Sequence, residues 1–193
     1  MTLREQQRAL AVATAAARAA GGLMRRNLAR TKNINEATQH DIKLELDVRC
    51  QKLIERTLRR AFPTVAILGE EGILGDPSAP ARWVVDPIDG TVNFAYGIPH
   101  AAVSIALQVR TPEGFRSEVG VVYDPFLDDL WTAIRGRPAR LNGRHGLIHA
   151  VNEDLMLGMV LGDKLRRLVQ VRDPDDGLPH VLFSTSGQLG GLN

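Results

Sequence analysis

The chain has 193 residues, 44% of them hydrophobic, and a formal net charge of only +2. This length and apolar content suffice to bury a sizeable core, most simply within one domain. The sequence has no run of about 18 apolar residues, which excludes a membrane-spanning helix, and its single cysteine excludes an internal disulfide framework and fits a reducing compartment, so we expect a cytoplasmic protein.

The charge is distributed unevenly along the chain. Residues 1–60 carry 13 Lys and Arg against 6 acidic residues, whereas the remainder carries 11 against 16. A basic part of this kind can contact RNA or another acidic partner, but a solvated helix surface explains the charge more simply. Nucleic acid is therefore not expected as a partner.

Two amphipathic helices are predicted before residue 63. Apolar residues recur every three or four positions near the N-terminus, at Leu10, Ala13, Ala17, Ala20 and Met24. A second set with the same spacing comprises Leu46, Cys50, Leu53, Ile54, Leu58 and Ala61, and Pro63 prevents this helix from continuing. Cys50 is consequently expected in the core.

Strands are predicted from residue 65 onward. A short strand covers 65–68, and a buried strand ends at 83–85. Three further runs of strand-like residues are separated by turn-forming segments, at 101–110, 118–123 and 130–134. Two leading helices followed by strands in series indicate an α+β arrangement with hairpin-like links in an antiparallel sheet.

Two acidic residues follow the strand that ends at residue 85. Pro87 stiffens the backbone between Asp86 and Asp89, and Gly90 permits a sharp turn into a helix that begins at Thr91. The N–H groups of Gly90 and Thr91 at that helix start can seat a phosphate. Hard oxygen ligands without nearby Cys or His favour Mg²⁺. An Asp-rich loop without function explains this motif alone about equally well.

The upstream strand also ends in acidic residues, within the segment Leu68-Gly69-Glu70-Glu71-Gly72. Two strands would therefore deliver carboxylates to one edge of the sheet. With this Gly-Glu-Glu and the Asp-Pro-Ile-Asp-Gly-Thr-x-Asn-Phe of residues 86–94, the chain resembles the inositol monophosphatase family of Mg²⁺-dependent, lithium-sensitive phosphomonoesterases. The resemblance continues through 102–107, 120–125 and 141–143 and covers nearly the whole chain.

The resemblance implies a layered α/β sandwich, of which this chain forms the N-terminal portion, with two leading helices and a mainly antiparallel sheet. Residues 1–193 are then expected to form a single domain that lacks its C-terminal part. Residues 184–193 resemble the start of the family's Gly-Ser-Ala-Ala helix, and the Trp-Asp-x-Ala motif that completes the second metal site is absent from the sequence.

The resemblance also implies a set of metal ligands and catalytic groups. Glu70, Asp86 and the carbonyl of Ile88 would hold one Mg²⁺, and Asp86 would be shared with Asp89 at a second ion. Glu70 and Thr91 would orient the attacking water. The backbone N–H groups of Gly90 and Thr91 would bind the substrate phosphate.

One further stretch departs from the family pattern. Asp41-Ile42-Lys43-Leu44-Glu45-Leu46-Asp47 keeps both acids of the family's Asp-x-Val-Thr-x-x-Asp but replaces Val and Thr by Lys43 and Leu44. Asp47 is therefore expected to act near the same catalytic site. Lys43 either contacts the substrate phosphate, since Glu36 stands where the family has a lysine, or lies in solvent, and the two interpretations are equally favoured.

These observations support two functions. The first is a Mg²⁺-dependent phosphomonoesterase that hydrolyses inositol monophosphate or a related small phosphate ester, without a membrane partner and as a homodimer in its complete form. The second is a truncated, catalytically impaired remnant that binds a partner or oligomerises. The residues that select the phosphate ester are not identified by the sequence.

Overall fold

The computed structural model describes residues 1–30, 34–37, 42–70, 72–145, 168–172 and 179–183. It contains three helices in these ranges, α1 (Leu3–Asn27), α2 (Glu45–Ala61) and α3 (Thr91–Ala95). None of them is long and apolar enough to cross a membrane. The strands follow in chain order as β1 (Ile34–Ala37), β2 (Ile42–Leu44), β3 (Ala66–Gly69), β4 (Gly72–Leu74), β5 (Ala81–Asp89), β6 (Ala102–Thr111), β7 (Gly114–Asp124), β8 (Asp129–Ile134), β9 (Arg140–Leu141), β10 (Arg144–His145), β11 (Leu168–Arg172) and β12 (Pro179–Phe183).

Helix α1 begins with a capping box. The Thr2 N–H donates to Glu5 Oε2 at 2.7 Å, and the Glu5 N–H donates to Thr2 Oγ1 at 3.3 Å, which satisfies two backbone donors at the helix start. The predicted apolar face is confirmed, although Leu10 is only half-buried. Most of this face is alanine, and small side chains let the helix axis approach the sheet closely.

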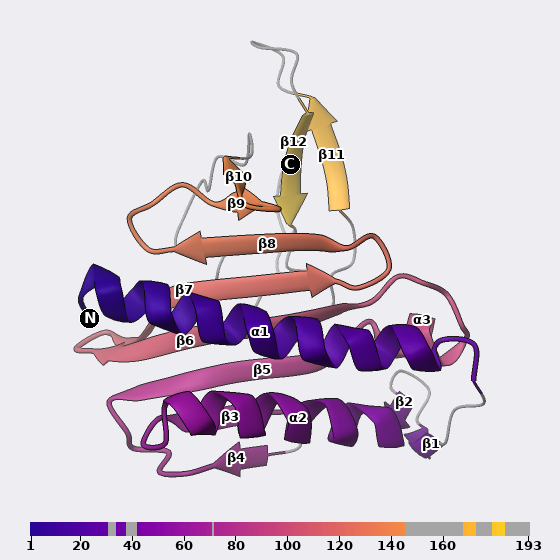
Figure 1. Cartoon of the computed structure of the whole chain (residues 1–193), viewed down its shortest axis with the longest axis horizontal. Helices are drawn as coiled ribbons and strands as arrows, with labels where there is room; N and C mark the ends of the chain where they lie inside the picture. Colours follow the sequence, from indigo (N-terminus) through magenta and orange to yellow (C-terminus); the bar gives the residue numbers. More distant parts are fainter. Residues whose placement is uncertain (31–33, 38–41, 71, 146–167, 173–178, 184–193) are drawn as a thin grey trace, which may run out of the picture.

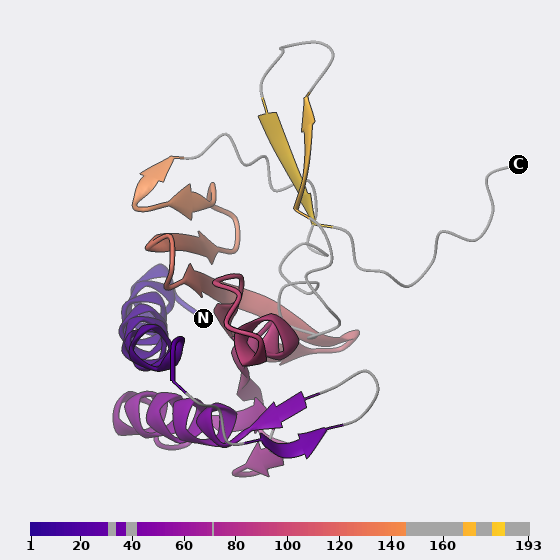
Figure 2. The same ribbon diagram turned by 90° about the vertical axis from the view of Figure 1, so that its right-hand side faces the viewer.

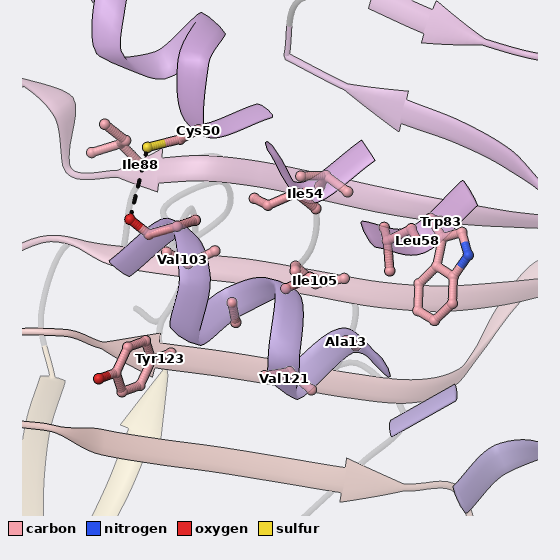
Figure 3. Close-up of a cluster of buried hydrophobic side chains, with 14 of the residues drawn as sticks. Ala13, Cys50, Ile54, Leu58, Trp83, Ile88, Val103, Ile105, Val121 and Tyr123 are labelled. Carbon is pink, nitrogen blue, oxygen red and sulfur yellow. Dashed lines mark hydrogen bonds between the residues drawn. The ribbon is translucent and has the colours of Figure 1, made fainter. Parts of the chain in front are cut away.

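Helix α2 confirms the second predicted pattern. Leu46, Cys50, Ile54 and Leu58 are buried, whereas Leu53 and Ala61 are half-buried at its margins. The Cys50 thiol lies 3.9 Å from the Ala20 carbonyl oxygen, where α2 packs against α1 (Figure 3). Burial raises the pKa of this thiol to about 12, so Cys50 is a core residue without nucleophilic character.

The main sheet has eight strands in the order β10-β9-β8-β7-β6-β5-β3-β4. Strands β3 and β5 are parallel, and every other neighbouring pair is antiparallel, which confirms the mainly antiparallel prediction. In this sheet β7 starts four residues earlier than predicted and β5 continues to Asp89, and the short strands β4, β9 and β10 were not predicted. The pairs β1–β2 and β11–β12 form separate two-stranded sheets.

Helices α1 and α2 lie side by side over one face of the main sheet (Figures 1 and 2). The core fills the space between them and strands β5, β6 and β7, with Trp83, Val103, Ile105, Val121 and Tyr123 from the sheet fully or almost fully buried (Figure 3). The Trp83 ring meets Phe62 edge to face, with ring centroids 5.6 Å apart. This rigid layer fixes where the ends of β3 and β5 lie.

Candidate active site

The acidic residues of both motifs come together because β3 and β5 run in parallel. Gly69 pairs with Val85 at the last position of their ladder, so Glu70 and Asp86 follow at the same edge of the sheet. The prediction that two strands deliver carboxylates to one edge is confirmed. Neither strand would bring these acids together alone, because β3 and β5 are separated in the sequence by β4 and become neighbours only by pairing.

An irregularity in β5 separates the two acidic residues of the second motif. Asp86 pairs with Ser104 and Asp89 with Ala102 on β6, and the register shifts between these two positions. Within the shift, Ile88 is 1% exposed and belongs to the core. The buried Ile88 side chain, which lies between the two acids in the sequence, holds this irregular backbone in place.

Gly90 makes the turn from β5 into α3. Its φ of 92° lies in the left-handed region, and a Cβ at this position would stand 2.9 Å from the His100 carbonyl oxygen. Both the conformation and the close approach require glycine. Thr91 then begins α3, and its Oγ1 donates a hydrogen bond to the Ile88 carbonyl oxygen at 2.8 Å.

The segment after α3 is tied back to the helix. Asn93 Nδ2 donates to the His100 carbonyl oxygen at 3.1 Å, and the Ile98 N–H donates to the Asn93 carbonyl oxygen at 2.9 Å. These bonds hold His100 beside Asp89. Asn93 of the motif therefore has a structural role that the sequence pattern did not indicate.

Asp86 is the electrostatic centre of the site. Burial, followed by the charges of Asp89, Glu70 and Asp47, raises its pKa well above the usual range, and a hydrogen bond from the Ile88 N–H offsets only part of this. Its Oδ1 is buried and has no hydrogen-bond partner. A buried carboxylate oxygen facing further carboxylates lacks a positive charge to stabilise its ionised form.

Asp89 is also buried, and its pKa is raised less strongly than that of Asp86. Burial raises the pKa of Asp89 to about 6, and the nearby His100 partly counteracts the shift. Nothing in the sequence pattern singled out His100, which follows the motif after an unremarkable turn. Only the fold of the α3–β6 connection brings it to the acidic residues.

Glu70 and Asp47 come to the site from two different elements, the end of strand β3 and helix α2. Glu70 follows β3 and is exposed, and the backbone before it is fixed because Gln51 of α2 packs against Gly69, where a Cβ would stand 2.5 Å from the Gln51 amide. Asp47 lies in the first turn of α2 and is 1% exposed. The role of Gln51 was not predictable, since a glutamine on a helix carries no distinguishing signal in the sequence.

Some predicted site residues are not fully placed. Lys43 lies in β2, which packs against α3, but its side chain and Glu71 are outside the described part of the chain, as are residues 184–193. Among the residues that are described, no three His, Cys, Asp or Glu side chains stand close enough together to hold a metal ion as they are arranged. The ligand and catalytic roles of Glu70, Asp86, Ile88, Asp89, Asp47, Gly90, Thr91 and Lys43 stay predictions.

The donors nevertheless fit a hard divalent cation. They are carboxylate and carbonyl oxygens, which are the ligands Mg²⁺ prefers, and His100 is the one described histidine beside them. The unpartnered Oδ1 of Asp86 is the strongest sign, since a cation would supply the charge that this atom lacks. The cluster therefore fits Mg²⁺ by its chemistry.

Comparison with known proteins gives a consistent result. The sequence model of the Inositol monophosphatase family matches residues 5–174. The chain is similar to Nus factor SuhB of Pseudomonas aeruginosa, with 38% identity over 188 residues, 95% of this chain and 67% of that protein. It is also similar to inositol monophosphatase 1 of Solanum lycopersicum, with 40% identity over 139 residues, 70% of this chain and 50% of that protein.

Solved structures show the same fold. The extragenic suppressor protein suhB of Bartonella henselae matches with a TM-score of 0.65 and 36% identity, over 72% of this chain and 54% of that one. The IMPase of Thermotoga maritima matches with a TM-score of 0.62 and 31% identity, over 71% and 52%. These matches confirm the layered α/β fold. The chain spans about half the length of these structures and of the Solanum protein, and about two thirds of the Pseudomonas protein.

Proposed function

The chain belongs to the inositol monophosphatase family, and from this premise we propose that it is a Mg²⁺-dependent phosphomonoesterase for inositol monophosphate or a related small phosphate ester. The observation that carries the proposal is Asp86, whose buried Oδ1 has no hydrogen-bond partner and whose pKa is raised by burial and by three further carboxylates. A structural protein gains nothing from such a cluster. A metal-dependent hydrolase uses it to bind its cation.

Each predicted residue has a distinct task in this proposal. Glu70, Asp86, Asp89 and the Ile88 carbonyl oxygen would hold Mg²⁺, which when bound supplies positive charge for the phosphate and lowers the pKa of water. Glu70 and Thr91 would orient the attacking water toward phosphorus. The N–H groups of Gly90 and Thr91, at the turn that Gly90 makes, would bind phosphate oxygens. Asp47 would act at the catalytic site from the first turn of α2, and Lys43 would contact the phosphate from β2.

Phosphate release from inositol 1-phosphate, measured with Mg²⁺ and with a chelator, tests this function. We expect release that depends on Mg²⁺ and is abolished in Asp86→Asn. Asp76→Asn, which removes the same charge from an exposed loop, should retain the activity of the parent chain. Calorimetric titration with Mg²⁺ should give heat for the parent chain and for Asp76→Asn but not for Asp86→Asn. Equal heats in all three proteins would remove Asp86 from the proposed metal site.

A second candidate function is binding without catalysis. It is favoured by the name of the Pseudomonas relative, Nus factor SuhB, which describes a factor and not an enzyme. If the chain folds and binds Mg²⁺ but releases no phosphate from any small ester, this second function is preferred. We also propose a cytoplasmic location, which the single, reduced and buried Cys50 supports.

A further inference from the structure

The outer surface of the two-helix layer carries most of the positive charge of the N-terminal part. On α1, the buried positions Ala13, Ala17 and Ala20 face the sheet, whereas the exposed Arg4, Arg25 and Arg26 lie on the opposite side of the helix. At about 100° per residue, these three arginines fall within one half-turn of the helix surface. The charge asymmetry of the sequence therefore becomes a spatial asymmetry.

Helix α2 repeats this arrangement more strictly. Its buried positions Leu46, Cys50, Ile54 and Leu58 define the inner side, and its five cations are all exposed on the outer side at Arg49, Lys52, Arg56, Arg59 and Arg60. From Arg49 to Arg59 the cations recur every three or four residues and form a stripe about 15 Å long. Because α1 and α2 lie side by side (Figures 1 and 2), the two rows run next to each other on helices whose axes are typically about 8–10 Å apart.

We call this surface the helix-layer basic face, and define it as Arg4, Arg25, Arg26, Arg49, Lys52, Arg56, Arg59 and Arg60. Ion pairs among the described residues involve Arg18, Arg116 and Arg135, but none of these eight. Of the four acidic residues of these helices, Glu5 bonds to Thr2, Glu55 bonds to Gln51 and Asp47 is buried. The fourth, Glu45, is exposed in the first turn of α2, so the eight cations outnumber the exposed acid on this face. The cations of this face can thus neutralise an external anion.

The side chains between the cations exclude three classes of partner: a bilayer, a protein and a single-stranded nucleic acid. Apart from Leu3 at the start of α1, the helices expose no large apolar residue, and neither helix contains an aromatic residue. A helix that lies on a bilayer needs an apolar face to insert, and a protein interface needs apolar or aromatic anchors. Stacking of unpaired bases also requires aromatic side chains. A partner that presents only regularly spaced phosphates fits this surface.

In contrast to the expectation from the sequence, we propose that the helix-layer basic face binds the phosphate backbone of double-stranded nucleic acid without reading its sequence. Seven of the eight cations are arginines, whose planar guanidinium forms two parallel hydrogen bonds to a phosphate. Two adjacent rows of cations contact several phosphates at once, and the affinity comes from the release of counterions. The face lies on the helices and uses none of the acidic site residues, so this binding is independent of phosphatase activity.

The test is fluorescence anisotropy of a labelled duplex of about 20 base pairs, titrated with the whole chain between about 50 and 200 mM salt. We expect log affinity to fall linearly with log salt. Lys52→Gln with Arg56→Gln should weaken binding and reduce the slope by about 0.9 for each phosphate that the variant no longer neutralises. The control is Arg137→Gln with Arg144→Gln, which removes the same charge from exposed positions near β9 and β10 and should bind like the parent chain.

Three results would overturn the proposal. Equal weakening by both double variants would show that net charge alone drives binding. Absence of duplex binding at low salt, with binding to vesicles of phosphatidylserine and phosphatidylcholine, would assign the face to a lipid surface. Affinities that differ strongly between two unrelated duplex sequences would contradict recognition of the backbone. Far-UV circular dichroism of each variant establishes that the helices are intact.

Discussion

Gly90 joins the acidic strand β5 to helix α3, and its replacement tests how strictly the site depends on this turn. Gly90→Ala places a Cβ 2.9 Å from the His100 carbonyl oxygen at a φ of 92°. We expect a decrease of about 2–4 kcal/mol in the free energy of unfolding, because a left-handed backbone and a backbone clash add together. Urea denaturation measures this decrease.

Gly97→Ala is the matched control for that substitution. Gly97 has a φ of 74°, but its Cβ would meet nothing within 4 Å. Only the conformational cost of about 1 kcal/mol is expected. If both variants are destabilised equally, the contact with the His100 backbone is unimportant and glycine is needed at Gly90 for its conformation alone.

Asp89 makes the stability of the metal-free protein depend on pH. Burial raises the pKa of Asp89 from 3.8 to about 6, so the folded chain binds more protons than the unfolded chain between these values. The free energy of unfolding is therefore highest below the unfolded pKa and decreases as pH rises through about 6, by about 3 kcal/mol in all. Urea denaturation in a chelating buffer at several pH values measures the slope. Asp89→Asn should flatten it, and an unchanged slope would assign the effect to other groups.

At the scale of elements, α1 docks on the sheet through a contact that admits no side chain. A Cβ at Gly21 would stand 2.5 Å from the Tyr123 ring and 2.9 Å from Pro125 Cβ. Gly21→Ala should therefore destabilise the protein by about 1–3 kcal/mol, despite the better helix propensity of alanine. Thermal unfolding followed at 222 nm gives the change.

At the neighbouring Gly22, the same substitution is expected to increase the stability of the protein. At Gly22 a Cβ would meet only the end of the Arg26 side chain, at 3.5 Å. Gly22→Ala should stabilise the protein by about 0.5–1 kcal/mol, since alanine loses less backbone entropy in a helix. A decrease in stability here, or a gain in Gly21→Ala, would show that α1 packs differently.

At the scale of the whole molecule, the acidic cluster of the metal-free protein opposes folding. In a chelating buffer near pH 7, Asp86→Asn should be more stable than the parent chain, because it removes a carboxyl group whose ionised form is opposed by burial and by the charges of Asp89, Glu70 and Asp47. With Mg²⁺ at about 100 times its dissociation constant, the parent chain should gain about 2.7 kcal/mol and roughly 5–10 °C in Tm. Asp86→Asn should gain nothing. Equal responses of the two proteins to Mg²⁺ would place the ion elsewhere.

The sequence by itself determined the two long helices, the central strands and the family. Apolar residues spaced three or four apart predicted both long helices, and the runs of β-branched residues predicted β3, β6, β7 and β8, because these patterns reflect local geometry that each segment carries alone. The motifs at Glu70 and at Asp86–Asp89 likewise identified the family.

Only the tertiary structure decided which groups meet. The parallel pairing of β3 with β5 places Glu70 beside Asp86, and the α3–β6 connection brings His100 to Asp89. The burial that raises the pKa of Asp86 depends on every layer around it. The outward alignment of the cations on α1 and α2 also required the packed helix pair, since the charge of a helix surface depends on which of its sides the sheet buries. Such contacts join residues distant in sequence, and no local pattern encodes them.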